Sequence, residues 1–349
     1  MEIISKLISS GFDALLEYLS YHVLTCLVPA FFIAGAIAVF VSKESVLKYF
    51  GPRANRVLSY GVASVSGTIL AVCSCTILPL FAGIWMSGAG LGPAIAFLYS
   101  GPAINILAIT YSAKLLGLDL GIGRAVGAIL FSVVIGLIMA FIYRREEMEK
   151  RADAEDEPLI VTDERGKKKS LPVYGVFFAA LVGILIFGAS KKVFPTGLSF
   201  LVLGGVVYRY FDGEELKQWM RETWDLAVKI FPVLIVGVFI AGALKAVIPP
   251  ESVARLVGNN GVVANLIASV TGTLFYFSTL TEVPIIRALM DMGMVKGPAL
   301  ALLLSGPALS LPSIIVLSRI MGLKKTLVYV ALVVVFSTAA GMLFGAVAG

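Results

Sequence analysis

Apolar segments long enough to cross a lipid bilayer recur along most of this 349-residue chain. They lie at about 19–41, 57–82, 91–113, 122–143, 173–190, 196–210, 226–248, 261–280, 296–318 and 325–347. A helix of roughly 20 apolar residues spans the ~30 Å of hydrocarbon in a bilayer. Only 14% of the residues are charged, whereas soluble domains carry roughly 25%. The sequence therefore predicts an all-α polytopic membrane protein with about ten transmembrane helices.

The glycine and proline pattern of the chain occurs twice. The tetrapeptide S-G-P-A is found at 100–103 and again 205 residues later at 305–308. The tripeptide G-P-A at 92–94 recurs at the same spacing at 297–299, and F-I-A-G-A occurs at 32–36 and 239–243. The same residues at a nearly constant spacing indicate two homologous, pseudo-symmetric halves.

Glycine and proline interrupt the apolar segments at matching positions of the two halves. In lipid an unpaired backbone amide is unfavourable by several kcal/mol, so a broken helix is tolerated only where protein or a water-filled cavity covers it. We therefore expect the Gly/Pro-broken helices to meet at the centre and line a transport cavity. Close helix packing explains isolated glycines equally well. Simple alternation of spans gives parallel repeats, whereas one re-entrant segment in each half gives inverted repeats.

The segment 144–172 separates the two halves and contains eight Lys or Arg and nine Asp or Glu residues. This composition is typical of a solvated linker, and its basic residues favour the cytoplasm. We expect a first transmembrane repeat at 1–143 and a charged cytoplasmic linker loop at 144–172. Connecting spans at 173–223 and a second transmembrane repeat at 224–349 complete the predicted organisation.

The two halves differ just before their matching prolines. The first half has Cys73 and Cys75, and the second has Glu282. Soft thiolates select soft metal ions and metalloids, so both cysteines are candidate ligands for a substrate or a metal; burial as small hydrophobic residues is the alternative. An acid inside a membrane commonly faces a cavity or carries protons, which makes Glu282 the candidate for proton coupling. Structural neutralisation of Glu282 by the nearby Arg287 is the alternative.

Residues around the two S-G-P-A segments are the other candidate substrate ligands. They are Tyr99, Ser100, Gly101, Pro102, Asn105, Ser305, Gly306, Pro307 and Ser310. Hydrogen bonding between helices is the alternative role of the polar members. His22 and Cys26 lie four residues apart on one helical face and form either a metal-binding pair or an ordinary interfacial pair.

The stretch C-S-C-T-x-L-P-L, the following G-P-A and S-G-P-A-I-N, and the second S-G-P-A-L-S resemble the YraQ/ArsP-like predicted permeases. The resemblance covers both halves and implies a permease of the bacterial inner-membrane type. The best-understood relatives export trivalent organoarsenicals, with cysteines implicated in recognition. The positions that match the motif are Cys73, Cys75, Ser100, Gly101, Pro102 and Asn105.

These observations predict a membrane permease for a small thiol-reactive solute, a trivalent organoarsenical or a soft metal ion, acting by proton-coupled efflux. The alternative is a redox-gated channel or permease for a small neutral solute, with the cysteines as sensors. The chain has no Walker, H-E-x-x-H or C-x-x-C-H motif, so we expect neither an enzyme nor a bound cofactor. We expect a lipid bilayer and a small-molecule or metalloid substrate as partners, and no nucleic acid. Homo-oligomer formation is left open.

Overall fold

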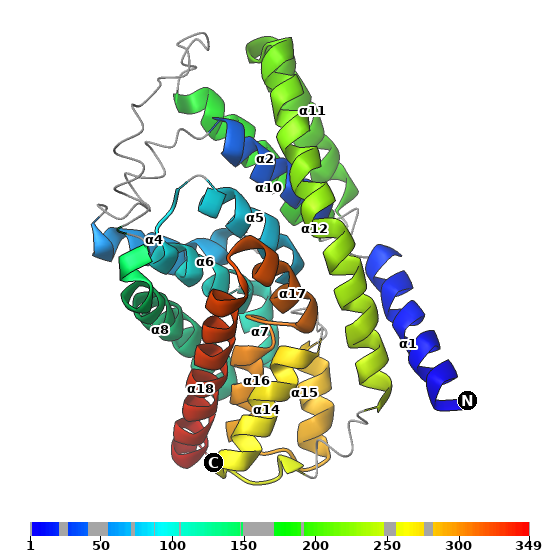
Figure 1. The fold of residues 1–349 in the computed structure, drawn as a ribbon, viewed down its shortest axis with the longest axis vertical. Helices are drawn as coiled ribbons and strands as arrows, with labels where there is room; N and C mark the ends of the chain where they lie inside the picture. The colour runs from blue at the N-terminus through cyan, green and yellow to red at the C-terminus, as the bar shows by residue number, and fades with distance from the viewer. Residues whose placement is uncertain are drawn as a thin grey trace.

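The computed structural model describes residues 2–20, 27–40, 55–70, 74–86, 88–104, 106–146, 148, 171–189, 192–247, 256–275 and 282–348. These residues form helices joined by short connections, and none of them forms a strand (Figure 1). Together with the apolar helices, this confirms the predicted all-α fold class of a polytopic membrane protein.

The helices follow the apolar segments closely. The first half contains α1 (Glu2–Tyr18), α2 (Val28–Phe40), α4 (Arg56–Leu70), α5 (Ser74–Met86), α6 (Leu91–Ala103), α7 (Ile106–Leu115) and α8 (Leu118–Ile142). The hairpin of α10 (Leu171–Ala189) and α11 (Val193–Tyr210) follows. The second half contains α12 (Gly213–Val247), α14 (Val262–Leu274), α15 (Glu282–Asp291), α16 (Lys296–Ser305), α17 (Leu311–Ile320) and α18 (Leu323–Ala348).

Several of the expected spans consist of two short helices. Among the described residues, four helices are long and apolar enough to cross a membrane, namely α8, α11, α12 and α18. The pair α6 and α7, bent by 46°, forms a fifth span if the two are taken together. The apolar segment at 296–318 is divided into α16 and α17 in the same way. The helices therefore break at the two S-G-P-A segments, because proline removes a backbone donor and glycine weakens the helix.

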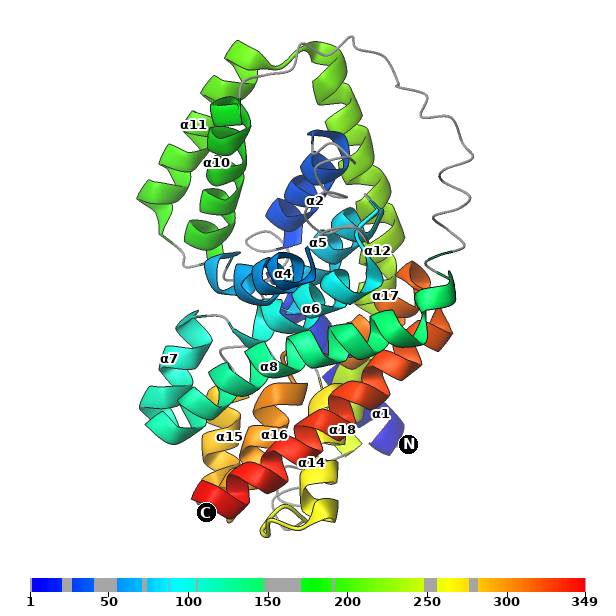
Figure 2. The same ribbon diagram turned by 90° about the vertical axis from the view of Figure 1, so that its left-hand side faces the viewer.

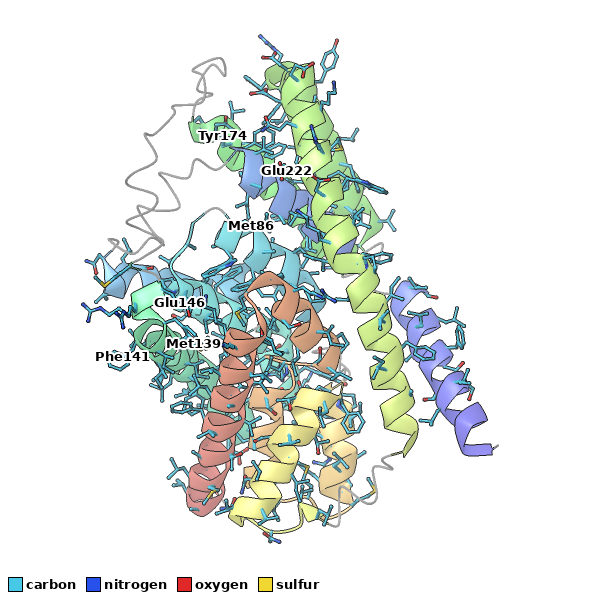
Figure 3. All side chains as sticks on the ribbon, viewed as in Figure 1. Met86, Met139, Phe141, Glu146, Tyr174 and Glu222 are labelled. Carbon is cyan, nitrogen blue, oxygen red and sulfur yellow. The ribbon has the colours of Figure 1, made fainter. Side chains whose placement is uncertain are left out.

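Apolar side chains on the outside of α8 match a lipid environment. Phe141 is 78% exposed, and Leu118 and Val126 are also exposed, whereas Met139 on the opposite face is buried. Figure 3 labels Met139 and Phe141 on this helix. A helix with an apolar exposed face and a buried inner face fits a helix at the periphery of a membrane bundle.

The equivalent helices α8 and α18 lie side by side at the front of the view and run antiparallel (Figure 2). Glu146 near the end of α8 pairs with Lys325 near the start of α18 at 2.8 Å. The rings of Phe131 and Phe336 lie 5.5 Å apart in the middle. Because these two residues are 205 positions apart, they are equivalent in the repeat. A pseudo-two-fold axis therefore passes between them, and the equivalent helices have opposite directions, as in an inverted repeat.

Close glycine contacts occur at equivalent places in the two halves. A Cβ atom on Gly136 of α8 would lie 2.6 Å from the carbonyl oxygen of Gly92 on α6. A Cβ atom on Gly341 of α18 would lie 2.6 Å from the carbonyl oxygen of Gly297 on α16. Only glycine allows such close approach of two helix backbones. The α6–α8 pair and the α16–α18 pair therefore pack in the same way, through equivalent glycines.

The two halves also exchange contacts. Helix α5 of the first half packs against α17 of the second, and α15 of the second half packs against α7 of the first. These two contacts are equivalent under the pseudo-two-fold axis. Helix α5, which contains Cys75, and helix α15, which begins at Glu282, therefore both lie at the boundary between the halves.

Candidate functional site

A buried ion pair joins the two halves. Arg124, near the start of α8, is fully buried, and Glu282, the first residue of α15, is 1% exposed. The Nη2 atom of Arg124 lies 3.5 Å from Oε2 of Glu282. Charges inside a membrane protein are unfavourable unless paired and are therefore concentrated at functional sites.

The first half holds the guanidinium group of Arg124 by two hydrogen bonds. Its Nε donates to the carbonyl oxygen of Ala103 at 3.2 Å, and its Nη1 donates to Ser112 Oγ at 3.0 Å. Ala103 is the last residue of the first S-G-P-A segment and of α6. Its carbonyl is freed for this bond because the helix ends there. The arginine is thereby fixed to the broken region of the first half.

The second half places its own S-G-P-A segment beside Glu282. A Cβ atom on Gly306 would lie 2.6 Å from Glu282 Oε1, so the glycine leaves room for the carboxylate. Helix α16 ends at Ser305, and residues 306–308 form turns. One ion pair therefore contacts both S-G-P-A segments, Arg124 touching the first and Glu282 the second.

Several polar atoms near this ion pair have no hydrogen-bond partner although they are buried. They are the hydroxyl oxygens of Tyr99, Tyr329 and Ser337, Nη2 of Arg124 and both carboxylate oxygens of Glu282. Tyr99 interacts electrostatically with Arg124 and with Tyr329, and it lies close to Ser337 without reaching it in good hydrogen-bond geometry. Each unpaired buried polar group is unfavourable by about 1–3 kcal/mol. Such a concentration of unpaired buried polar groups is typical of a ligand-binding site.

The serines of the predicted site have partners within the protein. Ser100 Oγ donates to the carbonyl oxygen of Ala63 at 2.9 Å, and Ser305 Oγ donates to that of Leu302 at 3.3 Å. Ser310 is the N-cap of α17 and accepts a hydrogen bond from the backbone amide of Ser313. The Ser100 bond joins α6 to α4, as expected for hydrogen bonding between helices, whereas the Ser305 bond lies within α16 and the Ser310 bond caps α17. Of the other candidates, Tyr99, Gly101, Pro102, Gly306 and Pro307 are buried at the two breaks.

The partner of Glu282 differs from the one considered in the sequence. Arg287 is 49% exposed and pairs with Asp291 at 3.0 Å, so the alternative in which it neutralises Glu282 is wrong. Arg124 takes that place, and the sequence analysis did not single it out. The signal was present, since Arg124 is a charged residue inside the apolar segment 122–143.

The thiol part of the predicted site is not described by the structure. Cys73, Cys26, His22 and Asn105 lie outside the described residues, and Cys75 lies in α5 with a side chain that is not described. Among the residues that are described, no group of three or more His, Cys, Asp or Glu side chains is placed to hold a metal ion. Thiol recognition therefore stays a prediction.

Comparison with known proteins identifies the family. Residues 9–346 match the ArsP_1 family, which is described as predicted permeases. The chain belongs to this permease family. It is 46% identical to the UPF0718 protein MJ0584 of Methanocaldococcus jannaschii, over 99% of this chain and 98% of that protein.

More distant relatives in this permease family come from bacteria. The UPF0718 protein YraQ of Escherichia coli is 25% identical, over 79% of this chain and 66% of YraQ. The UPF0718 protein YcgR of Bacillus subtilis is 23% identical, over 72% of this chain and 68% of YcgR. No solved structure matches the chain. The family and the apolar helices together confirm the resemblance to YraQ/ArsP-like permeases and support a multi-pass membrane transporter.

Proposed function

We propose that this protein is a proton-coupled permease in which the Arg124–Glu282 pair links and releases its two halves. The contact of this single ion pair with both S-G-P-A segments carries the proposal. Inverted repeats that meet at broken helices are typical of secondary transporters, which move one half against the other around a central site.

The two members of the pair are held unequally. Arg124 has two further hydrogen bonds, both to the first half, whereas neither carboxylate oxygen of Glu282 has a hydrogen-bond partner. A proton on Glu282 removes its attraction to Arg124, and Arg124 remains bound to α6 and α7. Protonation therefore weakens the contact between α15 and the first half. Glu282 is the group that carries the coupling proton.

The proposed cargo is a small thiol-reactive solute, either a trivalent organoarsenical or a soft metal ion, and the proposed direction is efflux across the cell inner membrane. The position of Cys75 supports this proposal, because α5 packs against both α6 and α17, the helices that border the two breaks. Cys73 immediately precedes α5. Soft thiolates at that place would recognise such a solute.

Flux into everted membrane vesicles under an imposed pH gradient tests the coupling. We expect the wild-type chain to accumulate the cargo in a gradient-dependent way, and Glu282→Gln to lose the dependence on the gradient. Arg287→Gln is the matched control on the same helix, because Arg287 is exposed and does not contact the pair. Gradient-dependent accumulation by Glu282→Gln would show that Glu282 does not carry the proton.

Resistance of cells to methylated arsenicals and to Cu, Zn and Cd salts tests the cargo. We expect Cys73→Ser and Cys75→Ser each to abolish resistance while the protein is still present in the membrane. Full resistance in both variants would remove thiol recognition from the proposal and leave the coupling untouched.

A further inference from the structure

Three buried hydroxyl groups without a hydrogen-bond partner lie together around Tyr99, which interacts with the Arg124 guanidinium. Tyr99 comes from α6, Arg124 from α8, and Tyr329 and Ser337 from α18. All four residues are fully buried, and the three hydroxyl groups and Nη2 of Arg124 have no hydrogen-bond partner. The set combines both halves of the chain, and two of its members, Arg124 and Tyr329, are equivalent positions of the repeat, 205 residues apart.

Comparison with the equivalent position of the repeat shows that the helix does not force the Ser337 hydroxyl to lack a hydrogen-bond partner. Ser132 of α8 is the residue equivalent to Ser337 of α18, 205 positions earlier. Ser132 Oγ donates to the carbonyl oxygen of Ile129, one turn earlier, at 2.7 Å. An α-helix offers the same kind of carbonyl to Ser337, yet the Ser337 hydroxyl is unpaired. The Ser337 hydroxyl instead lies toward Tyr99 without a hydrogen bond in good geometry, and it therefore keeps capacity for a ligand.

The charges around Arg124 indicate what that ligand is. Glu282 is the charged side chain that the structure places against Arg124. Of the helices that pack around the pair, α7 presents the neutral Ser112 and α16 presents Gly306, while Arg287 and Asp291 of α15 pair with each other on the outside. When Glu282 is neutral, Arg124 carries a positive charge without a negative partner, and the Tyr99 hydroxyl beside it adjoins the hydroxyl groups of Tyr329 and Ser337.

We propose that Tyr99, Arg124, Tyr329 and Ser337 bind a small monoanion, an inorganic oxyanion or the carboxylate of an organic solute, in place of the Glu282 carboxylate. A guanidinium N–H and hydroxyl groups all donate to the charged oxygens of such a ligand. The anion takes over the charge compensation of Arg124, and Glu282 takes up one proton. The exchange conserves charge, since one anion and one proton enter together.

This inference rests on the proposed function in one respect, namely that Glu282 is the proton acceptor. It adds the chemical class of a ligand, which is either the cargo itself or an ion that moves with it. Anion binding and proton uptake are therefore coupled, and each favours the other.

Isothermal titration calorimetry of the purified full chain in lipid nanodiscs tests the site, with nitrate and formate as probes. Both probes remain ionised at about pH 6 and about pH 8. Titrations in buffers of different ionisation enthalpy report the protons taken up for each anion bound. We expect tighter binding at the lower pH, with uptake of about one proton. Binding of nitrate alone assigns an inorganic oxyanion, and binding of formate alone assigns a carboxylate.

Substitutions that remove only a hydroxyl group locate the site. We expect Tyr99→Phe and Tyr329→Phe each to weaken anion binding by roughly tenfold, because each loses one hydrogen bond to a charged group. Ser132→Ala is the matched control for Ser337→Ala and leaves the affinity unchanged. Absence of binding by both probes, or unchanged affinity in the hydroxyl-deleted variants, would overturn the inference.

The variant Glu282→Gln separates this inference from the proposed function. We expect it to bind the anion at both pH values without taking up a proton. If Glu282→Gln still takes up one proton with each anion, the anion site stands and the assignment of the coupling proton to Glu282 fails.

Discussion

Replacement of one partner of the Arg124–Glu282 pair should destabilise the protein more than replacement of both. At 3.5 Å and an effective dielectric constant of about 20, two unit charges attract each other by roughly 5 kcal/mol. Removing one member of a buried pair leaves an uncompensated charge and typically lowers stability by about 3–5 kcal/mol. We therefore expect Arg124→Gln to lower the free energy of unfolding by about 4 kcal/mol.

The double variant Arg124→Gln, Glu282→Gln carries no buried charge at this place. Two amide side chains of similar size replace the charged groups, and the desolvation of both ions is avoided. We expect the double variant to recover most of the lost stability, which gives a coupling free energy of roughly 3 kcal/mol in a double-mutant cycle. Coupling of this size is typical of residues in contact or in one salt-bridge network, whereas distant sites add within about 0.3–0.5 kcal/mol.

Equilibrium unfolding in mixed micelles, followed by tryptophan fluorescence, measures these differences, because the chain contains three tryptophans. Arg287→Gln on the same helix is the control, and since its pair with Asp291 is half exposed we expect a change of at most about 0.5 kcal/mol. If the effects of Arg124→Gln and Glu282→Gln add within about 0.5 kcal/mol, the two residues do not form the buried pair, and the reasoning about the junction fails.

Three further experiments test other contacts described above. Gly306→Ala should displace the Glu282 carboxylate and reduce gradient-driven flux, with expression retained, because its Cβ would lie 2.6 Å from Oε1; flux equal to wild type would contradict this. Gly341→Ala should lower stability by about 1–3 kcal/mol, because its Cβ would meet the backbone of α16. In a chain without its native cysteines, Phe131→Cys and Phe336→Cys should crosslink through a short bifunctional thiol reagent, as gel mobility shows, because the two rings lie 5.5 Å apart; absence of the crosslinked band would contradict this contact.

Much of the helical organisation could be predicted because it depends on local properties of the sequence. The apolar segments at 122–143 and 325–347 correspond to α8 and α18 within a few residues. The duplicated S-G-P-A segments coincide with the ends of α6 and α16. Proline and glycine act on the backbone of their own helix, so their positions alone locate these breaks.

The partner of Glu282 could not be predicted in the same way. Arg287 is near Glu282 in sequence, but on α15 its side chain lies on the exposed face. Arg124 is distant in sequence and reaches Glu282 only because α15 packs against α7, which in turn packs against α8, across the boundary between the halves. Such contacts depend on the relative direction of the repeats, and counting apolar segments leaves that direction undecided.

The pseudo-symmetry itself indicates where the two halves have acquired different roles. The position equivalent to Glu282 is Ile77, which is buried and apolar, and the position equivalent to Arg124 is Tyr329. Two equivalent buried ion pairs would connect the halves at two places. Protonation of one carboxylate would then break only one of these two connections. With a single pair at this place, protonation of one carboxylate removes the fully buried electrostatic link, and the pairs Glu146–Lys325 and Asp119–Lys296, each with an exposed member, remain. Because this ion pair occurs in one half-to-half contact and not in its symmetric equivalent, one proton is sufficient to release the buried contact. Introducing Ile77→Glu together with Tyr329→Arg adds the equivalent pair, and we expect flux to depend more steeply on pH in this variant.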